Sequence, residues 1–157
     1  MPACPENDPR ITAYGMLLEA FAAVTHAVGK ELERTAGMPT AWFEVLIRLV
    51  RSPDHKLRMS DLAAQVQLST SGLTRLIDRL EAAGYVERQP CPGDRRGLNA
   101  VLTEGGLKAL NDALPSHLDA LDRYVAQPLG GDVETVTDLL RRLRDNAGPC
   151  PGALPCG

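Results

Sequence analysis

Apolar residues recur at helical spacing in two neighbouring segments near the middle of the chain. Residues 60–66 present one apolar face, and Ser60 is a predicted N-cap. Residues 69–80 follow the i, i+3, i+4, i+7 pattern of a buried helical stripe, and Ser69 is the second predicted N-cap. Gly84 is a predicted helix-ending glycine. The pattern therefore predicts two short helices joined by a tight turn.

Two strand-like runs, residues 85–88 and 98–102, follow these helices. The segment between them, residues 89–97, is rich in Pro and Gly and is predicted to be a loop. This order of elements is typical of a winged helix-turn-helix, which holds duplex DNA. We therefore expect a mainly α fold with a small two- or three-stranded β-wing, flanked by N- and C-terminal dimerisation helices.

The polar side of the second short helix is the predicted DNA contact. Short hydroxyl side chains and arginines near a helix start suit close approach to phosphates and base edges in a major groove. The predicted contacts on this helix are Ser69, Thr70, Ser71, Thr74, Arg75 and Arg79. On the wing, Arg95 and Arg96 are predicted to reach a neighbouring minor groove. Asp94 is the wrong charge for DNA and fits a brace that fixes an arginine by an ion pair.

Long apolar stripes at helical spacing flank this central unit, in residues 9–35, 103–125 and 133–143. Thr103 is the predicted cap of the second stripe, and Pro115 should kink or break that helix. One small winged domain cannot bury all three stripes. Either the outer helices form a bundle within one chain, or two subunits interlock their first and last helices.

Length and charge agree with a single DNA-binding domain. The chain of 157 residues fits one domain with one core. The net charge is −3, yet residues 56–96 hold seven Lys and Arg against five Asp and Glu, while the remainder holds ten against fifteen. A slightly basic face on an acidic body still attracts phosphates locally. DNA binding should therefore depend on geometry and dimerisation more than on total charge.

The expected organisation is one regulator domain, residues 9–145, between N- and C-terminal tails at 1–8 and 146–157. Within it, residues 9–36 and 103–145 are the dimerisation helices and residues 40–102 the DNA-binding lobe. The sequence shows no long apolar run typical of a membrane span and no signal-peptide pattern. We expect a cytoplasmic protein without a membrane partner.

Residues 60–103 resemble the MarR-type winged helix-turn-helix regulators. The resemblance lies in LEAAGYVER at residues 80–88, the wing Asp94-Arg95-Arg96 and the Leu102-Thr103 pair that opens the next helix, and it extends roughly from residue 14 to residue 143. It implies a homodimer on double-stranded DNA, with a pseudo-palindromic operator whose half-sites lie ~10 bp apart. It also implies a transcriptional regulator, most often a repressor, that a small effector releases from DNA.

The same resemblance places an effector cleft near the helix expected at residues 39–51, which Thr40 would cap. Many such regulators bind small aromatic acids there. The predicted pocket residues are Tyr14, Phe21, His26, Trp42 and Arg48. A Trp at a helix start is also typical of a core or an interface.

Two alternatives remain open, and a third, an enzyme, is not expected. Some MarR-type regulators sense oxidants, and Cys4 or Cys91 would then be the reactive thiol, although neither has a run of neighbouring cations. A protein-interaction module without DNA binding would keep the outer helices but would not need an arginine-tipped wing. An enzyme is not expected, because nucleophile-elbow, phosphate-loop and metal-ligand spacings are missing, so no catalytic residue, cofactor or metal site is predicted.

Overall fold

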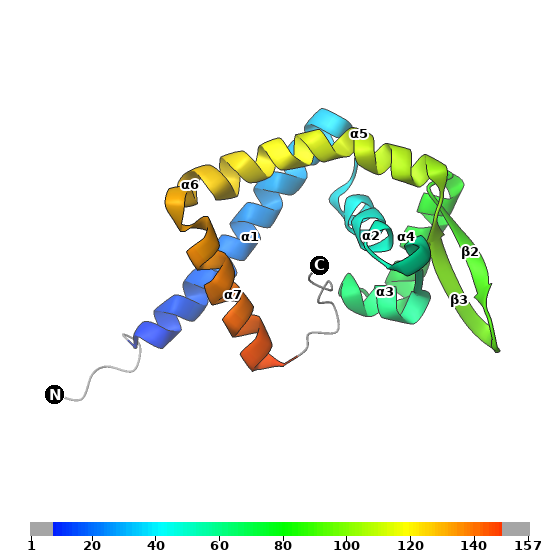
Figure 1. Ribbon diagram of the computed structural model, residues 1–157, viewed down its shortest axis with the longest axis horizontal. Coiled ribbons are helices and arrows are strands. Elements are labelled where there is room, and N and C mark those ends of the chain that lie inside the picture. Colours follow the sequence, from blue (N-terminus) through cyan, green and yellow to red (C-terminus); the bar gives the residue numbers. More distant parts are fainter. Residues whose placement is uncertain (1–7, 149–157) are drawn as a thin grey trace.

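The computed structural model describes residues 8–148, apart from the side chains of Arg95 and Arg96. Its elements are, in chain order, α1 (Pro9–Ala36), α2 (Thr40–Val50), η2 (Pro53–His55), β1 (Lys56–Arg58), α3 (Met59–Gln65), α4 (Thr70–Ala82), β2 (Val86–Cys91), β3 (Asp94–Leu102), α5 (Glu104–Leu121), η3 (Asp122–Ala126), α6 (Gln127–Leu129), η4 (Gly130–Asp132) and α7 (Val133–Ala147). Helix α5 links the small lobe of α2, α3, α4 and the sheet to the outer helices α1 and α7 (Figure 1).

The core lies inside the small lobe and beneath α5. Leucines and isoleucine from α2, α3 and α4 are almost fully excluded from solvent, and they pack with Val86 and Ala100 of the sheet. Burying apolar surface of this kind contributes roughly 1.5–3 kcal/mol per large side chain. The apolar stripe predicted for residues 69–80 is part of this core: Leu73, Leu76, Ile77 and Leu80.

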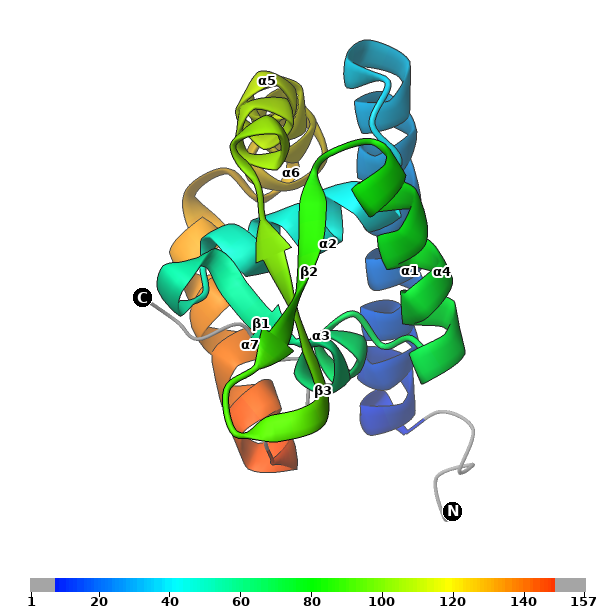
Figure 2. The same cartoon turned by 90° about the vertical axis from the view of Figure 1, so that its right-hand side faces the viewer.

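The wing is a three-stranded antiparallel sheet in the order β1-β3-β2, and its hairpin projects from the helices (Figures 1 and 2). The prediction of a loop over residues 89–97 was wrong. Strand β2 continues to Cys91 and β3 begins at Asp94, so only Pro92 and Gly93 form the turn. The two prolines fit because the register is irregular between Pro90 and Cys91 and because β2 is an edge strand.

Three predicted helix boundaries are confirmed. The Ser69 hydroxyl accepts a hydrogen bond from the Gly72 amide at 3.1 Å, and the Thr103 hydroxyl accepts one from the Gly106 amide at 3.0 Å. Gly84 has a φ of 76° after the last residue of α4, a conformation in which a side chain would be strained.

Two predicted caps are wrong. Helix α2 begins at Thr40 itself and α3 begins one residue before Ser60, and neither helix has a side-chain cap. Thr40 serves packing instead, because a Cβ on Gly29 of α1 would lie 2.4 Å from the Thr40 Oγ1 atom. This close crossing holds α2 against α1.

Pro115 does not break its helix. Helix α5 continues to Leu121 with Pro115 exposed on its surface. The residues Ala113 and Ala120 are buried on either side of the proline, so packing holds the helix in register across it. At the other end of this region, α7 extends to Ala147, two residues into the segment expected to be a tail.

The outer helices leave much apolar surface uncovered. Helix α7 has no buried residue, and among the residues of α1 only Val28, Gly29 and Leu32 are buried. An intramolecular bundle of the outer helices would bury these stripes, so it is not the arrangement of the described residues. By length and composition alone α1 is also apolar enough to cross a membrane, with a mean hydropathy of 1.4 over 18 residues.

Candidate nucleic-acid interface

Helix α4, the candidate recognition helix, is packed against the core on one side and exposed to solvent on the other. Its apolar stripe is at most 2% exposed, so the helix cannot rotate without opening the core. The opposite side is exposed to solvent and carries the polar residues that the sequence singled out: Thr70, Ser71, Thr74, Arg75 and Arg79. This side is therefore the surface that a DNA groove can reach.

Two arginines on this side have guanidinium groups that can donate hydrogen bonds to a ligand. Within residues 8–148, neither Arg75 nor Arg79 forms a hydrogen bond or an ion pair with a described side chain. The hydroxyls are partly engaged within the helix: Thr74 donates to the Thr70 carbonyl at 2.8 Å, and Ser69 both caps the helix and lies 3.3 Å from the Ser71 hydroxyl. The arginines are thus the strongest free donors of the helix.

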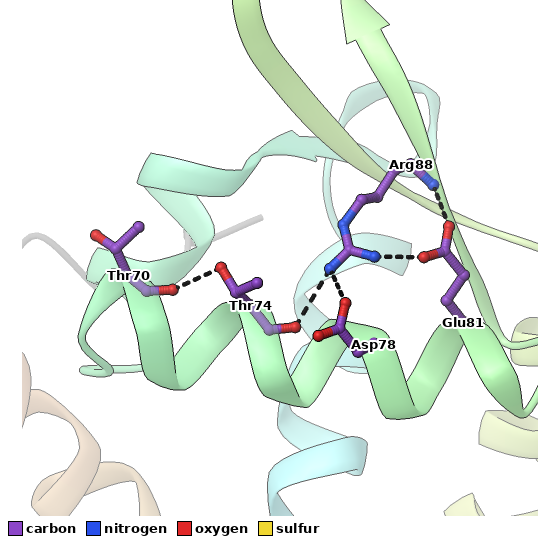
Figure 3. A network of polar contacts seen from close by, with 5 residues as sticks. All are labelled: Thr70, Thr74, Asp78, Glu81 and Arg88. Atoms are coloured by element: carbon purple, nitrogen blue, oxygen red, sulfur yellow. Dashed lines mark hydrogen bonds and ion pairs between the residues drawn. The ribbon is translucent and has the colours of Figure 1, made fainter.

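Arg88 of β2 connects the wing to the recognition helix (Figure 3). Its guanidinium donates to the Asp78 carboxylate at 2.6 Å, to the Thr74 carbonyl at 3.2 Å and to the Glu81 carboxylate. Its backbone amide donates to the other oxygen of Glu81 at 3.1 Å. The Arg88 side chain is only 20% exposed, so this contact is better shielded than an ordinary surface pair.

The Arg88 contacts have two consequences for DNA binding. They set the angle between α4 and the β2–β3 hairpin, so helix and wing approach a duplex as one unit. They also place a positive charge between two carboxylates that would otherwise repel phosphates from this side of α4. This role of Arg88 was not predicted from the sequence, although acidic residues on the exposed side of α4 were a signal that a cation lies nearby.

Next to the turn of the hairpin, Arg58 of β1 forms an ion pair with Asp94, the first residue of β3. The predicted brace thus holds an arginine of a neighbouring strand. Contact with Cys91, and then the charge and hydrogen bond of Asp94, raise the pKa of Arg58, so the guanidinium stays charged. A Cβ on Gly97 would lie within 3.0 Å of Arg58, Asp94 and Cys91, so only glycine allows this close packing.

Of the remaining residues predicted on the wing or as reactive thiols, the structure describes only some. Arg95 and Arg96 follow directly after the turn in β3, and their side chains are outside the described structure. Cys91 is half-buried, with its Sγ atom 3.1 Å from the Asn99 Oδ1 atom. Cys4 lies outside the described residues. No group of three or more His, Cys, Asp or Glu side chains suited to a metal ion occurs in the described part of the chain.

A cavity of about 480 Å³ lies between α1, α2 and α5, where the outer helices meet the DNA-binding lobe. Its walls are largely apolar, with polar groups from Thr25, Glu44, Arg48, Arg51 and His117. The His117 ring lies against Phe43 at a centroid distance of 4.3 Å, and its Nδ1 atom is buried without a hydrogen-bond partner among the described residues. Burial lowers the pKa of His117, so the ring is neutral at neutral pH.

The five predicted pocket residues do not line one cavity. Arg48 lies in the wall of the 480 Å³ cavity. Trp42 lines a separate, smaller one. Tyr14, Phe21 and His26 lie on exposed positions of α1. The sequence could not separate these sites, because helical spacing shows which residues share a face and not which helix covers it.

The fold and this surface together define a winged helix-turn-helix DNA-binding protein. The sequence profile of the MarR family matches residues 36–97. The chain is also similar to AbsC, a MarR family transcriptional regulator from Streptomyces coelicolor, with 35% identity and a TM-score of 0.78 over 94% of this chain and 97% of AbsC. The chain belongs to the MarR family, and it is a transcriptional regulator and not an enzyme.

Further relatives agree with this assignment. The structure of Sco3205 from Streptomyces coelicolor, a MarR family regulator solved in complex with DNA, is 31% identical with a TM-score of 0.77, covering 92% of this chain and 91% of Sco3205. The regulator MhqR of Bacillus subtilis is 29% identical over 84% of this chain and 89% of MhqR. The transcriptional repressor MprA of Escherichia coli is 33% identical over 70% of this chain, which spans 62% of MprA.

Proposed function

We propose that this protein is a repressor that binds a pseudo-palindromic operator as a homodimer and is released by a small aromatic effector. The observation that carries the proposal is the pair Arg75 and Arg79, unpaired on the open side of a helix whose other side is locked in the core. A relative of the same fold, Sco3205, was solved on DNA. Because the proposed partner is chromosomal DNA, we propose that the protein acts in the cytoplasm.

The exposed apolar side chains of the outer helices support the homodimer. On α1, Ile11, Tyr14 and Phe21 are each more than half exposed, and on α7 Leu139, Leu140 and Leu143 are 46–57% exposed. Contiguous apolar surface of this kind marks an interaction site on a soluble protein. Because it lies on the first and last helices, interlocking of two copies would cover it and also account for the apolar length of α1.

The dimer also supplies what one lobe lacks. The lobe is only slightly basic, so its attraction for phosphates is weak. A two-fold axis through the outer helices would present two copies of α4 about one helical turn, or ~10 bp, apart on the DNA. Two matched half-sites then give an affinity and specificity that a single α4 cannot.

The 480 Å³ cavity is the proposed effector site. Its volume falls in the range of roughly 300–1,000 Å³ that is typical of small-molecule pockets. Phe43 and His117 offer ring faces, and Arg48 and Arg51 offer positive charge for an acidic or phenolic group. Because α1 belongs to the outer helices and α2 to the DNA-binding lobe, a ligand between them would alter the spacing of the two recognition helices.

A second mode of release is oxidation of Cys91. Its thiol lies beside Arg58 and Asp94 next to the turn of the hairpin, close to Gly97. Hydrogen peroxide would transfer one oxygen to the sulfur, giving a sulfenic acid and water. The added oxygen has no room there without moving the Arg58–Asp94 pair, and the hairpin would shift with it.

The test is selection of operator DNA by the purified protein, followed by footprinting and measurement of stoichiometry. We expect protection of two half-sites ~10 bp apart by two protomers. Phenolic and benzoic acids should then release the DNA from the wild-type protein and fail to release it from Phe43→Leu/His117→Leu. Protection of one half-site by a monomer would refute the homodimer, and release of the double variant as well would refute the effector site.

A further inference from the structure

A second cavity, of about 220 Å³, lies on the other side of α2 from the proposed effector site. It is enclosed by the end of α1, the start of α2, the residue Tyr85 that follows α4, and one side of α5. The lining residues are Ala36, Gly37, Met38, Trp42, Tyr85, Ala109, Asp112 and Ala113, none of which lines the first cavity. Its volume is below that of pockets for drug-sized ligands, so it fits a small head group.

Two of its walls are aromatic. The rings of Trp42 and Tyr85 are perpendicular, with an interplanar angle of 86° and a centroid distance of 5.8 Å. Both side chains are half-buried, so the corner that they form is partly shielded from water. The π-face of each ring is negative and attracts a cation, most strongly for Trp and where the cation is desolvated.

The other polar features of this cavity are also negative. Asp112 of α5 is a lining residue with a carboxylate, and Ala36 and Gly37 line the cavity at the C-terminal end of α1, which is the negative end of a 28-residue helix. In the structure the Lys108 ammonium donates to the Asp112 Oδ2 atom at 2.5 Å. The chain therefore already places an alkylammonium at the edge of this site.

The internal ammonium can be replaced at little cost. Lys108 and Asp112 are 77% and 64% exposed, and an exposed pair one helical turn apart is weak. An external cation would keep the contact with Asp112 and lie against the two aromatic rings of the lining, whereas Lys108 is not a lining residue.

We propose that this second cavity binds a small organic cation, a quaternary or alkyl ammonium head group, which replaces the Lys108 ammonium on Asp112 and lies against Trp42 and Tyr85. The site also touches the DNA-binding lobe directly. The Tyr85 amide donates to the Leu80 carbonyl of α4 at 2.9 Å, and the Tyr85 carbonyl accepts from Thr103 at 3.1 Å. An occupant would thus contact Tyr85, a residue that is hydrogen-bonded both to α4 and to Thr103, the N-cap of α5.

The test uses the only tryptophan of the chain, Trp42, as the reporter. Choline and its uncharged carbon isostere 3,3-dimethylbutan-1-ol are titrated into the full protein without DNA, at constant ionic strength set with NaCl. We expect a saturable change in Trp42 fluorescence with choline, and binding of the isostere weaker by about tenfold or more. Equal binding of the two compounds, or no saturable change with choline, would overturn the proposal.

Matched variants locate the site. Asp112→Asn should weaken choline binding at least about fivefold, and Lys108→Gln, which removes the internal competitor, should strengthen it. Asp119→Asn, an exposed position on the same helix, is the control and should change nothing. Unchanged binding in both Asp112→Asn and Lys108→Gln would place the cation elsewhere. Because no DNA is present, either failure would leave the proposed repressor function intact.

Discussion

Replacing Arg88 with methionine tests whether wing and recognition helix form one unit. Methionine keeps the apolar stem of the side chain and removes the guanidinium, with its contacts to Asp78, Glu81 and the Thr74 carbonyl. Arg88 forms ion pairs with both Asp78 and Glu81. Each exposed ion pair contributes roughly 0.2–1 kcal/mol, and the shielding of Arg88 favours the upper end of this range for both pairs. Arg88→Met should therefore lower the free energy of unfolding by about 1–2 kcal/mol.

Urea unfolding measures this loss. With a denaturant dependence of about 2 kcal/mol per M, the midpoint should fall by roughly 0.5–1 M. Wild type and variant must be compared at one protein concentration, because a dimer's stability depends on it. Arg75→Met is the matched control: an unpaired exposed arginine, whose loss should change stability by less than about 0.5 kcal/mol.

A double-mutant cycle separates the ion pair from other effects of the substitution. Combined with Asp78→Asn, Arg88→Met should show a coupling free energy of about 0.5 kcal/mol or more. The double variant should also recover part of the DNA affinity that Arg88→Met loses, because the uncompensated carboxylate on α4 is gone. An unchanged urea midpoint together with zero coupling would refute this account of Arg88.

Three further predictions follow from the outer helices, the half-buried His117 and the wing thiol. Phe21→Glu should convert the dimer to a monomer in sedimentation and abolish operator binding, and a dimeric variant would contradict the α1 interface. Burial lowers the pKa of His117 from 6.5. The contribution of the neutral ring to stability is therefore present above pH 6.5 and is lost as the pH falls toward the folded-state pKa. His117→Phe should reduce the difference in unfolding free energy between pH 7.5 and 5.5, whereas the exposed control His55→Asn should leave that difference unchanged. Mild peroxide should weaken operator binding of the wild type and spare Cys91→Ser, and equal sensitivity of both proteins would exclude the thiol.

Local patterns in the sequence predicted most of the fold. The stripe in α4 and the caps Ser69 and Thr103 depend on residues within one helical turn, and the structure contains them as expected. The wing was harder because its turn formers, Pro90 to Gly97, suggested a loop. Pairing between β2 and β3, which continues to Cys91 and Asp94, overrides that local preference.

The site was predictable only where one element supplies it. Arg75 and Arg79 could be found from the polar side of a single helix. The Arg88 contacts join residues 7–14 positions apart across a helix and a strand, so they appear only when β2 lies beside α4. The two cavities depend on which sides of α2 are covered by α1 and α5, and periodicity does not carry that information.

The salt dependence of operator binding tests the central claim, that the open side of α4 contacts DNA, most directly. Affinity is measured by fluorescence anisotropy between about 50 and about 200 mM salt, a range over which the free energy gained from counterion release falls strongly. The Arg75→Ala/Arg79→Ala variant should bind at least about tenfold more weakly, with a shallower salt slope, while its urea midpoint stays near that of the wild type. A variant with wild-type affinity and wild-type slope would contradict the claim.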